Sequence, residues 1–358
     1  MSYQDGIDAI NLAMPARIPR TEYSVERHWE VVRHVTGQQV DENSLPEQQQ
    51  MGSTALRKTW NYDFQWSTHI GREWLGDCYT EMGHAEYEPG GVDFHPVGQR
   101  PFADTDTIFA FDPIKQLPDP SKRDLIAYFN QAYAALQAEN PDCVHTVGTY
   151  ITLISGFIYL FGWQDMLMAL GEDQTTFGEM TFRYADWMMP FYEALAACDA
   201  PVVLIHDDIV WSSGPFISPR WYRKYVFPHY ERYLQPLKAA GKKVLFCSDG
   251  GFDVFVDDLA AVGMDGFIFE PFTSLEKIAS KYGQSHVIIG NADTRILLSG
   301  TKEEIRKEVE RCMFIGRDCP GYFMAVGNHI PANTPIENVL YYNQVYEELS
   351  NTLRKGMA

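Results

Sequence analysis

The sequence predicts an α/β fold, a (β/α)8 TIM barrel preceded by an irregular N-terminal extension. From about residue 105 onward, short apolar segments alternate with amphipathic segments, which is typical of a parallel sheet covered by helices. A chain of 358 residues is long enough for one such barrel. A doubly wound open sheet is the alternative. Such sheets usually carry a glycine-rich phosphate loop, and the chain has neither a GxGxxG segment after a strand nor a P-loop.

The N-terminal part of the chain is less regular than the rest. Residues 1–104 carry Trp60, Trp66 and Trp74 among many polar residues. We expect residues 1–104 to form a lid that packs on the barrel and contributes its first elements, and residues 105–358 to form the barrel. Both parts then belong to a single structural domain. An independent N-terminal module is the alternative.

The later elements follow from local patterns. β-branched and apolar runs predict strands, and apolar residues three and four apart predict helices. Ser218-Pro219 favours a helix start, Thr301 and Glu304 form a capping box, and Gly263 is typical of a helix end. The expected strands are 143–152, 200–205, 243–246, 266–269, 287–290 and 322–326. The expected helices are 121–140, 164–198, 218–240, 254–262, 274–282, 301–315 and 336–353.

Charge and composition exclude several classes of protein. The formal net charge of −19 disfavours binding to nucleic acid and to anionic membrane surfaces. No stretch approaches the roughly 20 apolar residues that span a bilayer, and no signal peptide is visible. The six cysteines contain no CxxC pair and do not resemble a disulfide framework. We therefore expect a cytoplasmic protein with reduced thiols. The sequence leaves a homodimer open.

Polar residues follow five successive predicted strands. In a (β/α)8 barrel the carboxyl ends of the strands form the mouth that binds ligands, so these side chains are expected to share one site. The residues concerned are His206, Asp207, Asp208 and Trp211; Cys247 and Asp249; Glu270; Asn291 and Asp293; and Asn328 and His329.

Each of these residues also has a purely structural interpretation. Cys247 is explained equally well as a small buried apolar residue, and His206 as a hydrogen-bonded core histidine. Asp249 precedes two glycines and fits a turn. Glu270 follows an apolar strand and needs a partner, which a salt bridge at the mouth would supply. Asp207 and Asp208 are adjacent, so only one is expected to face the pocket, and we favour Asp208.

Taken together, the residues suggest a division of roles. Cys247, Asp249 and His329 offer sulfur, oxygen and nitrogen ligands for a tetrahedral metal with one open position. The candidates for proton transfer are Asp208, Glu270, His206 and Asp207. The candidates for substrate binding are Trp211, Asn291 and Asn328.

Four stretches of the chain resemble the uroporphyrinogen decarboxylase superfamily, which includes cobalamin-dependent methyltransferases. They cover roughly residues 200–345, in the order and at the spacing of the family, and a short ARIP match at 16–19 adds to them. The stretches are DDIV…GPFISP (207–219), CSDG (247–250), GNADT…GTKEE (290–304) and GNHI…TPIEN (327–338). The resemblance implies the same (β/α)8 barrel.

The resemblance also has implications for the site. The Arg-rich R-Q-A-G-R segment of true porphyrinogen decarboxylases is absent, because residues 16–23 read ARIPRTEY. The zinc ligands of the thiol methyltransferases, His, Cys and a later Cys, correspond to Cys247, Asp249 and Asn328, with His329 one residue further on. The resemblance therefore implies zinc or a similar divalent metal on Cys247, Asp249 and His329, with Glu270 as a substitute ligand.

Two activities follow from the resemblance. The first is transfer of a methyl group from a small methoxylated or methylated donor to cob(I)alamin carried by a corrinoid partner protein, which yields methylcobalamin. A carboxylate-rich site favours an oxygen donor over a thiolate, and an aromatic content of 14% agrees with a methoxyaromatic. The alternative is a metal-independent lyase that acts on a small carboxylated substrate, with Asp207 or Asp208 as the proton donor.

Overall fold

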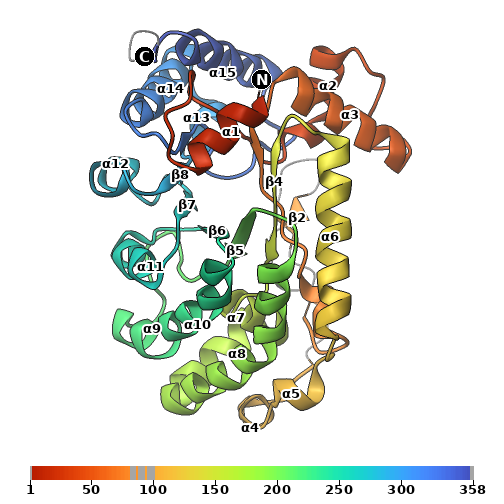
Figure 1. Cartoon of the computed structure of the whole chain (residues 1–358), viewed down its shortest axis with the longest axis vertical. Coiled ribbons are helices and arrows are strands. Elements are labelled where there is room, and N and C mark those ends of the chain that lie inside the picture. The colour runs from red at the N-terminus through yellow and green to blue at the C-terminus, as the bar shows by residue number, and fades with distance from the viewer. Residues whose placement is uncertain (1, 81–85, 88–92, 95–100, 355–358) are drawn as a thin grey trace.

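Seven parallel strands form the central sheet of the computed structural model, which describes residues 2–80, 86–87, 93–94 and 101–354. Helices surround this curled sheet, and α1 and α15 lie at the same end of the molecule (Figure 1). In spatial order the strands are β1 (Phe64–Gln65), β4 (Val144–Thr149), β5 (Val202–His206), β6 (Lys243–Ser248), β7 (Gly266–Phe269), β8 (Val287–Ile289) and β9 (Tyr322–Phe323). A separate antiparallel pair joins β2 (Glu86–Tyr87) to β3 (Asp93–Phe94).

The sheet differs from the expected closed barrel in its number of strands. Within the described residues, the central sheet has seven named strands rather than eight. Residues 19–21 connect its two edges, because Met324 N donates to Pro19 O (2.8 Å) and Asp63 N donates to Arg20 O (3.0 Å). This extended segment contains the helix-breaking Pro19 and is too short to show strand periodicity, so the sequence pattern did not reveal it.

The helices that cover the sheet largely match the expected ones. Thr301 and Glu304 form the predicted capping box, and Gly263 (φ 106°) ends a helix as predicted. The helices that follow the N-terminal region are α6 (Lys122–Glu139), α7 (Ile154–Glu172), α8 (Gln174–Ala197), α9 (Pro219–Tyr225), α10 (Phe227–Ala239), α11 (Val256–Val262), α12 (Leu275–Tyr282), α13 (Thr294–Ser299), α14 (Lys302–Gly316) and α15 (Ile336–Ser350).

Two long predicted helices are each divided in the structure. Within 164–198, Asp173 is extended and its carboxylate accepts hydrogen bonds from Thr175 N and Thr176 N, so one helix ends and the next begins there. Within 218–240, the helix is interrupted at Val226, two residues before Pro228, which has no N–H to donate a helical hydrogen bond. Apolar periodicity continues across both breaks, which is why the sequence pattern merged the helices.

The N-terminal region is more regular than its sequence pattern indicated. Its helices α1 (Ser2–Ile10), α2 (Trp29–Thr36) and α3 (Pro46–Thr59) precede β1, which pairs with β4 in the central sheet. The short helices α4 (Thr105–Phe109) and α5 (Pro113–Gln116) lead into α6. Residues 81–85, 88–92 and 95–100 of the expected extension lie outside the described residues. None of the described helices is long and apolar enough to cross a membrane.

Alternate residues along the strands face two different cores. In β5, Val202 and Leu204 belong to an inner apolar cluster, whereas Val203 and Ile205 pack toward the surrounding helices. The inner cluster also contains Ala9 and Ile10, which places the end of α1 against the interior of the sheet. The curled sheet therefore encloses its own core at one end, and the polar strand ends lie at the other.

One glycine in this core supports the first prediction. A Cβ at Gly148 would lie 1.9 Å from Leu204 O, a backbone atom of the neighbouring strand. Gly148→Ala is expected to lower the free energy of unfolding by about 1–3 kcal/mol, because β4 and β5 would have to separate. Urea unfolding measures this change. Gly171→Ala is the matched control, since nothing lies within 4 Å of its added methyl group, and equal stability of the two variants would contradict the prediction.

Candidate functional site

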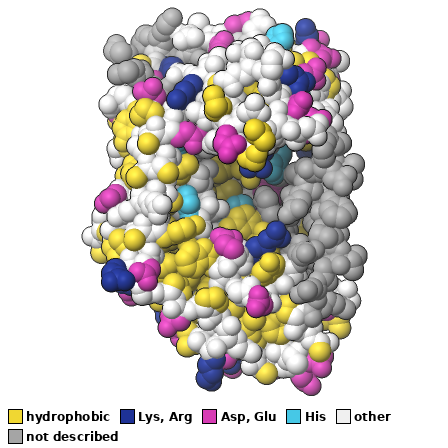
Figure 2. Space-filling model, turned by 90° about the vertical axis from the view of Figure 1, so that its right-hand side faces the viewer, with side chains coloured by type: hydrophobic (Ala, Val, Ile, Leu, Met, Phe, Trp, Pro, Cys, Tyr) yellow, Lys and Arg dark blue, Asp and Glu magenta, His cyan; other side chains and the backbone are white. Residues whose placement is uncertain are grey.

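A cavity of about 310 Å³ lies at the carboxyl ends of the strands, and we call it the inner cavity. Its polar wall comes from β5, β6 and the loop after β9, and its aromatic wall includes Tyr23, Trp66, Tyr150 and Phe269. Figure 2 shows a hollow near the middle of one face, surrounded by hydrophobic, acidic, basic and histidine side chains. The polar residues at the inner cavity include His206, Cys247, Ser248, Asp249, Asn328 and His329.

His206 lies in a tightly connected group at the end of β5. Its Nε2 is 3.0 Å from Asp208 Oδ1, and its ring centroid is 4.2 Å from that of Tyr150, whose hydroxyl donates to Asp208 Oδ2 (3.2 Å). Burial lowers the pKa of His206, but the neighbouring Asp208 and Cys247 outweigh burial, so its pKa is well above the usual value. Burial raises the pKa of the Cys247 thiol. The surroundings therefore favour the protonated form of His206 and, through burial, the protonated form of Cys247.

Asp249 lines the inner cavity, and Glu270 lies behind it, outside the lining of that cavity. Asp249 N donates to Asp208 Oδ1 (3.0 Å), and the Glu270 carboxylate accepts hydrogen bonds from Gly250 N and from the side-chain amide of Asn328. Burial and the charges of Asp208 and Glu270 raise the pKa of Asp249 well above its usual value. The Asp249 carboxyl group therefore keeps its proton to a higher pH than an ordinary carboxyl group does.

Asp207 points away from the cavity. Its carboxylate accepts hydrogen bonds from Ser155 N (2.6 Å), Ile154 N (3.2 Å) and the Tyr230 hydroxyl (2.6 Å), which fixes the N-terminus of α7 to the end of β5. Ser155 Oγ in turn accepts a hydrogen bond from Asp208 N (2.8 Å). Asp207 thus holds the backbone that positions Asp208, and the two adjacent carboxylates point in different directions.

The buried Asp207 carboxylate supports a prediction about pH and stability. Burial raises its pKa from 3.8 to about 6, so the folded state holds this proton more tightly than the unfolded state does. The contribution of Asp207 to the free energy of unfolding should therefore fall as pH rises from about 4 to about 6, by up to about 3 kcal/mol. Urea midpoints of the wild type and Asp207→Asn across this pH range test the prediction, and parallel pH curves would contradict it.

Two predicted substrate-binding residues lie elsewhere, and a third lies at the cavity. Trp211 is 44% exposed and packs against Trp163 and Phe216, outside the lining of the inner cavity. The Asn291 amide donates to Thr273 O (2.9 Å) and accepts from Arg311, so it supports the loop after β7. Asn328 does line the inner cavity.

Sequence reasoning missed the contribution of the N-terminal half. Tyr23 and Arg27 follow the segment that joins the sheet edges, and Trp66 follows β1. Because β1 has only two residues, its pattern could not be recognised as a strand. Tyr150 follows β4 directly, but it was missed because the predicted strand, 143–152, extends beyond the end of β4 and includes it.

The family-implied metal does not fit the arrangement of these side chains. Cys247, Asp249 and His329 all line the inner cavity. Across residues 2–80 and 101–354, however, no group of three His, Cys, Asp or Glu side chains is placed to hold one metal ion. The His329 ring packs on Tyr23 with a centroid separation of 4.5 Å. The zinc site therefore stays a prediction from the residue types and from the family resemblance.

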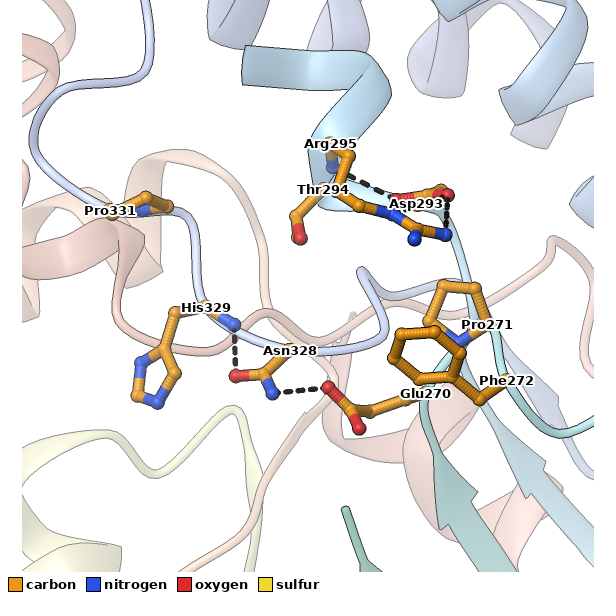
Figure 3. Close-up of a pocket in the computed structure, with 9 residues that line it drawn as sticks. All are labelled: Glu270, Pro271, Phe272, Asp293, Thr294, Arg295, Asn328, His329 and Pro331. Atoms are coloured by element: carbon orange, nitrogen blue, oxygen red, sulfur yellow. Dashed lines mark hydrogen bonds and ion pairs between the residues drawn. The ribbon is translucent and has the colours of Figure 1, made fainter. Parts of the chain in front are cut away.

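A second, smaller cavity of about 200 Å³ adjoins the first, and we call it the outer cavity. In Figure 3 the Arg295–Asp293 ion pair lies on one side of it, and Asn328 reaches toward Glu270 on the other. The Arg295 guanidinium also lies 5.1 Å from the centroid of Phe272. Asn328 and His329 line both cavities.

Comparisons with known proteins find relatives among the uroporphyrinogen decarboxylases. The chain is 29% identical over 174 residues to a uroporphyrinogen decarboxylase from Carboxydothermus hydrogenoformans, which covers 48% of each chain. It is 31% identical over 163 residues to the same enzyme from Thermus thermophilus, covering 46% of each. The chain thus spans about half the length of the curated relatives it matches.

A solved structure shares the fold over nearly the whole chain. A methyltransferase from Methanosarcina mazei superposes with a TM-score of 0.66 at 16% sequence identity, covering 97% of this chain and 98% of that one. The sequence model of the family described as uroporphyrinogen decarboxylase (URO-D) matches residues 86–349, which include β4 to β9 and most of the polar strand ends. The chain therefore belongs to the uroporphyrinogen decarboxylase (URO-D) family.

Proposed function

We propose that the chain is a corrinoid-dependent methyltransferase that removes a methyl group from a small methoxylated donor bound in the inner cavity. The observation that carries this proposal is the pairing, in one cavity, of an aromatic wall with Asp249, whose pKa is raised by burial and by the nearby Asp208 and Glu270. Tyr23, Trp66 and Phe269 offer faces for a flat donor, and Asp249 offers a proton. This combination suits an aromatic ether better than a thiolate, because a thiolate would be repelled by Asp208 and Glu270.

The chemical difficulty in demethylating an ether is the leaving group. When the C–O bond breaks, the bonding pair stays on oxygen, and an alkoxide or phenoxide is a poor leaving group unless it is protonated. In the proposed step Asp249 gives its proton to the ether oxygen, the methyl group leaves to an external nucleophile, and the demethylated product is an alcohol or phenol. Asp208 and Glu270 keep Asp249 protonated before the step.

His206 and Asp208 have a supporting role in this proposal. The imidazolium is held against Asp208 and against the Tyr150 ring, so its position is defined before the donor binds. Its positive charge stabilises the Asp249 carboxylate that remains after proton transfer. A corrinoid carried by a partner protein supplies the reduced cobalt that accepts the methyl group.

The proposal is tested in an anaerobic assay with cob(I)alamin and a panel of donors such as anisole, 1,2-dimethoxybenzene and methanol. We expect formation of methylcobalamin together with an equal amount of phenol or catechol monoether from the aromatic donors. Metal analysis of the assayed protein, beside Cys247→Ser, tests the zinc prediction separately. The absence of demethylated product from the whole panel, with a protein that binds the aromatic donors, would refute the proposed activity.

Arg27 favours a second candidate function. Its guanidinium lines the inner cavity and forms no ion pair with the residues that the structure describes. A cation in this position suits a carboxylated substrate, as the alternative lyase requires. Release of CO₂ from a carboxylated aromatic without cob(I)alamin would favour the lyase, and its loss in Arg27→Met would place the carboxylate at this residue.

A further inference from the structure

The two cavities share part of their lining. The inner cavity is about 310 Å³ and the outer cavity about 200 Å³, and Asn328 and His329 are the two residues that line both. In Figure 3 the His329 ring points away from the Arg295–Asp293 pair of the outer cavity. We call these two residues, Asn328 and His329, the wall between the cavities.

Several contacts hold the wall in place. Asn328 Oδ1 accepts a hydrogen bond from His329 N (2.7 Å), and the Asn328 amide donates to Glu270. The His329 ring packs on Tyr23, which stacks on Trp66 with a centroid separation of 5.5 Å. These contacts fix both ends of the wall, so it is part of the folded framework and not a freely rotating side chain.

The backbone before the wall is constrained by close packing. A Cβ at Gly327 would lie 2.4 Å from Pro271 Cδ and 3.1 Å from Glu270 Cα. Only glycine lets the loop after β9 approach the end of β7 this closely, which brings Asn328 within reach of Glu270. Three consecutive residues, Gly327, Asn328 and His329, therefore position and form this wall.

We infer that His329 determines the size of molecule that the inner cavity accepts. Its ring closes the inner cavity against the outer one, and removing the ring joins the two into one longer space. The inference depends on the proposed function only for the identity of the natural donor. A ligand with a substituent that extends past His329 is excluded from the wild type and admitted once the ring is absent.

Cys247 provides a way to test this without methyl transfer, because its thiol lines the inner cavity. Benzyl and 4-phenylbenzyl methanethiosulfonate are compared for their rates of labelling at Cys247, measured by mass spectrometry with Cys247→Ser as background; the benzyl group is no larger than the proposed donors, and the 4-phenylbenzyl group is one ring longer. Both reagents react with the Cys247 thiolate, so the ratio of the two rates at one pH does not depend on the fraction of Cys247 that is deprotonated. A cavity too small for added carbon atoms discriminates by about ten-fold or more. We therefore expect the ratio of 4-phenylbenzyl to benzyl labelling to rise at least about ten-fold in His329→Ala.

Two further variants make the outcome specific. His329→Phe keeps a ring at this position and should keep the wild-type ratio, which separates a steric role from a role of the imidazole nitrogens. His286→Ala is the matched control, since His286 precedes β8 at the opposite end of the strands. Equal ratios in the wild type and His329→Ala would overturn the inference. A changed ratio in a protein that demethylates no donor would leave the inference standing and reject only the proposed activity.

Discussion

Replacing Asp249 by asparagine is expected to lower the turnover number for methyl transfer by about 10²–10⁴-fold. Asparagine has nearly the same shape as aspartic acid but has no acidic proton to give to the ether oxygen. The donor should still bind, because the aromatic wall is unchanged, so the Michaelis constant should change little. The measurement is steady-state kinetics of product formation with cob(I)alamin in excess.

The control for this variant is Asp257→Asn, which removes an exposed carboxylate paired with Lys281. Its activity should match the wild type. A turnover number for Asp249→Asn within about three-fold of the wild type would show that Asp249 is not the general acid. A large rise in the Michaelis constant without loss of turnover would instead assign Asp249 to binding.

The pH profile gives an independent check of the same residue. An acid must be protonated to act, so the rate should fall as pH rises through the pKa of Asp249. Burial and the charges of Asp208 and Glu270 raise that pKa. Glu270→Gln removes one of these charges, lowers the pKa of Asp249 and should move the alkaline limb of the profile to lower pH. An unchanged limb would contradict this account.

Replacing Arg20 by methionine is expected to have the largest effect on stability, a loss of about 3–5 kcal/mol in the free energy of unfolding. The Arg20 and Glu22 side chains are both fully buried, and Arg20 Nη2 lies 3.0 Å from Glu22 Oε1. Glu22 also accepts hydrogen bonds from the Tyr342 hydroxyl (2.7 Å) and Val326 N (3.0 Å). Without Arg20, this carboxylate would remain buried with no cation beside it.

The surroundings of Arg20 explain why the chain tolerates a buried guanidinium. It lies 4.8 Å from the Trp60 ring centroid and 4.5 Å from that of Tyr346, so aromatic faces cover it above its ion pair. This cluster joins the segment between the sheet edges to α15 and to the end of β9. Its loss should therefore loosen the N-terminal side of the inner cavity as well.

Urea unfolding tests the prediction against two other variants. Arg123→Met removes an exposed arginine, 92% accessible and paired with Asp124, and should change stability by less than about 0.5 kcal/mol. Arg20→Met combined with Glu22→Gln should recover part of the loss, because a neutral amide costs less to bury than a carboxylate. A loss of less than about 1 kcal/mol in Arg20→Met would contradict the argument.

The sequence predicted the second half of the fold closely. The strand at 266–269 has the predicted limits, and the capping box at Thr301 and the helix end at Gly263 are present. These features depend on interactions between residues close in the chain, so local patterns reveal them. Two breaks between helices were missed, because the apolar periodicity of the sequence continues through Asp173 and Val226 whereas the helices are interrupted there.

By itself, the sequence determined that the polar strand ends would meet at one edge of a parallel sheet, since strand direction and alternation are local properties. His206, Cys247, Asp249, Asn328 and His329 do line one cavity. Only the tertiary structure decided that Asp207 points to α7, that Tyr23, Arg27 and Trp66 complete the cavity, and that His329 also lines a neighbouring cavity. The physical reason is that the direction of a side chain and its contacts with distant residues depend on how separate helices and strands pack. Burial among those residues then shifts the pKa of the side chain.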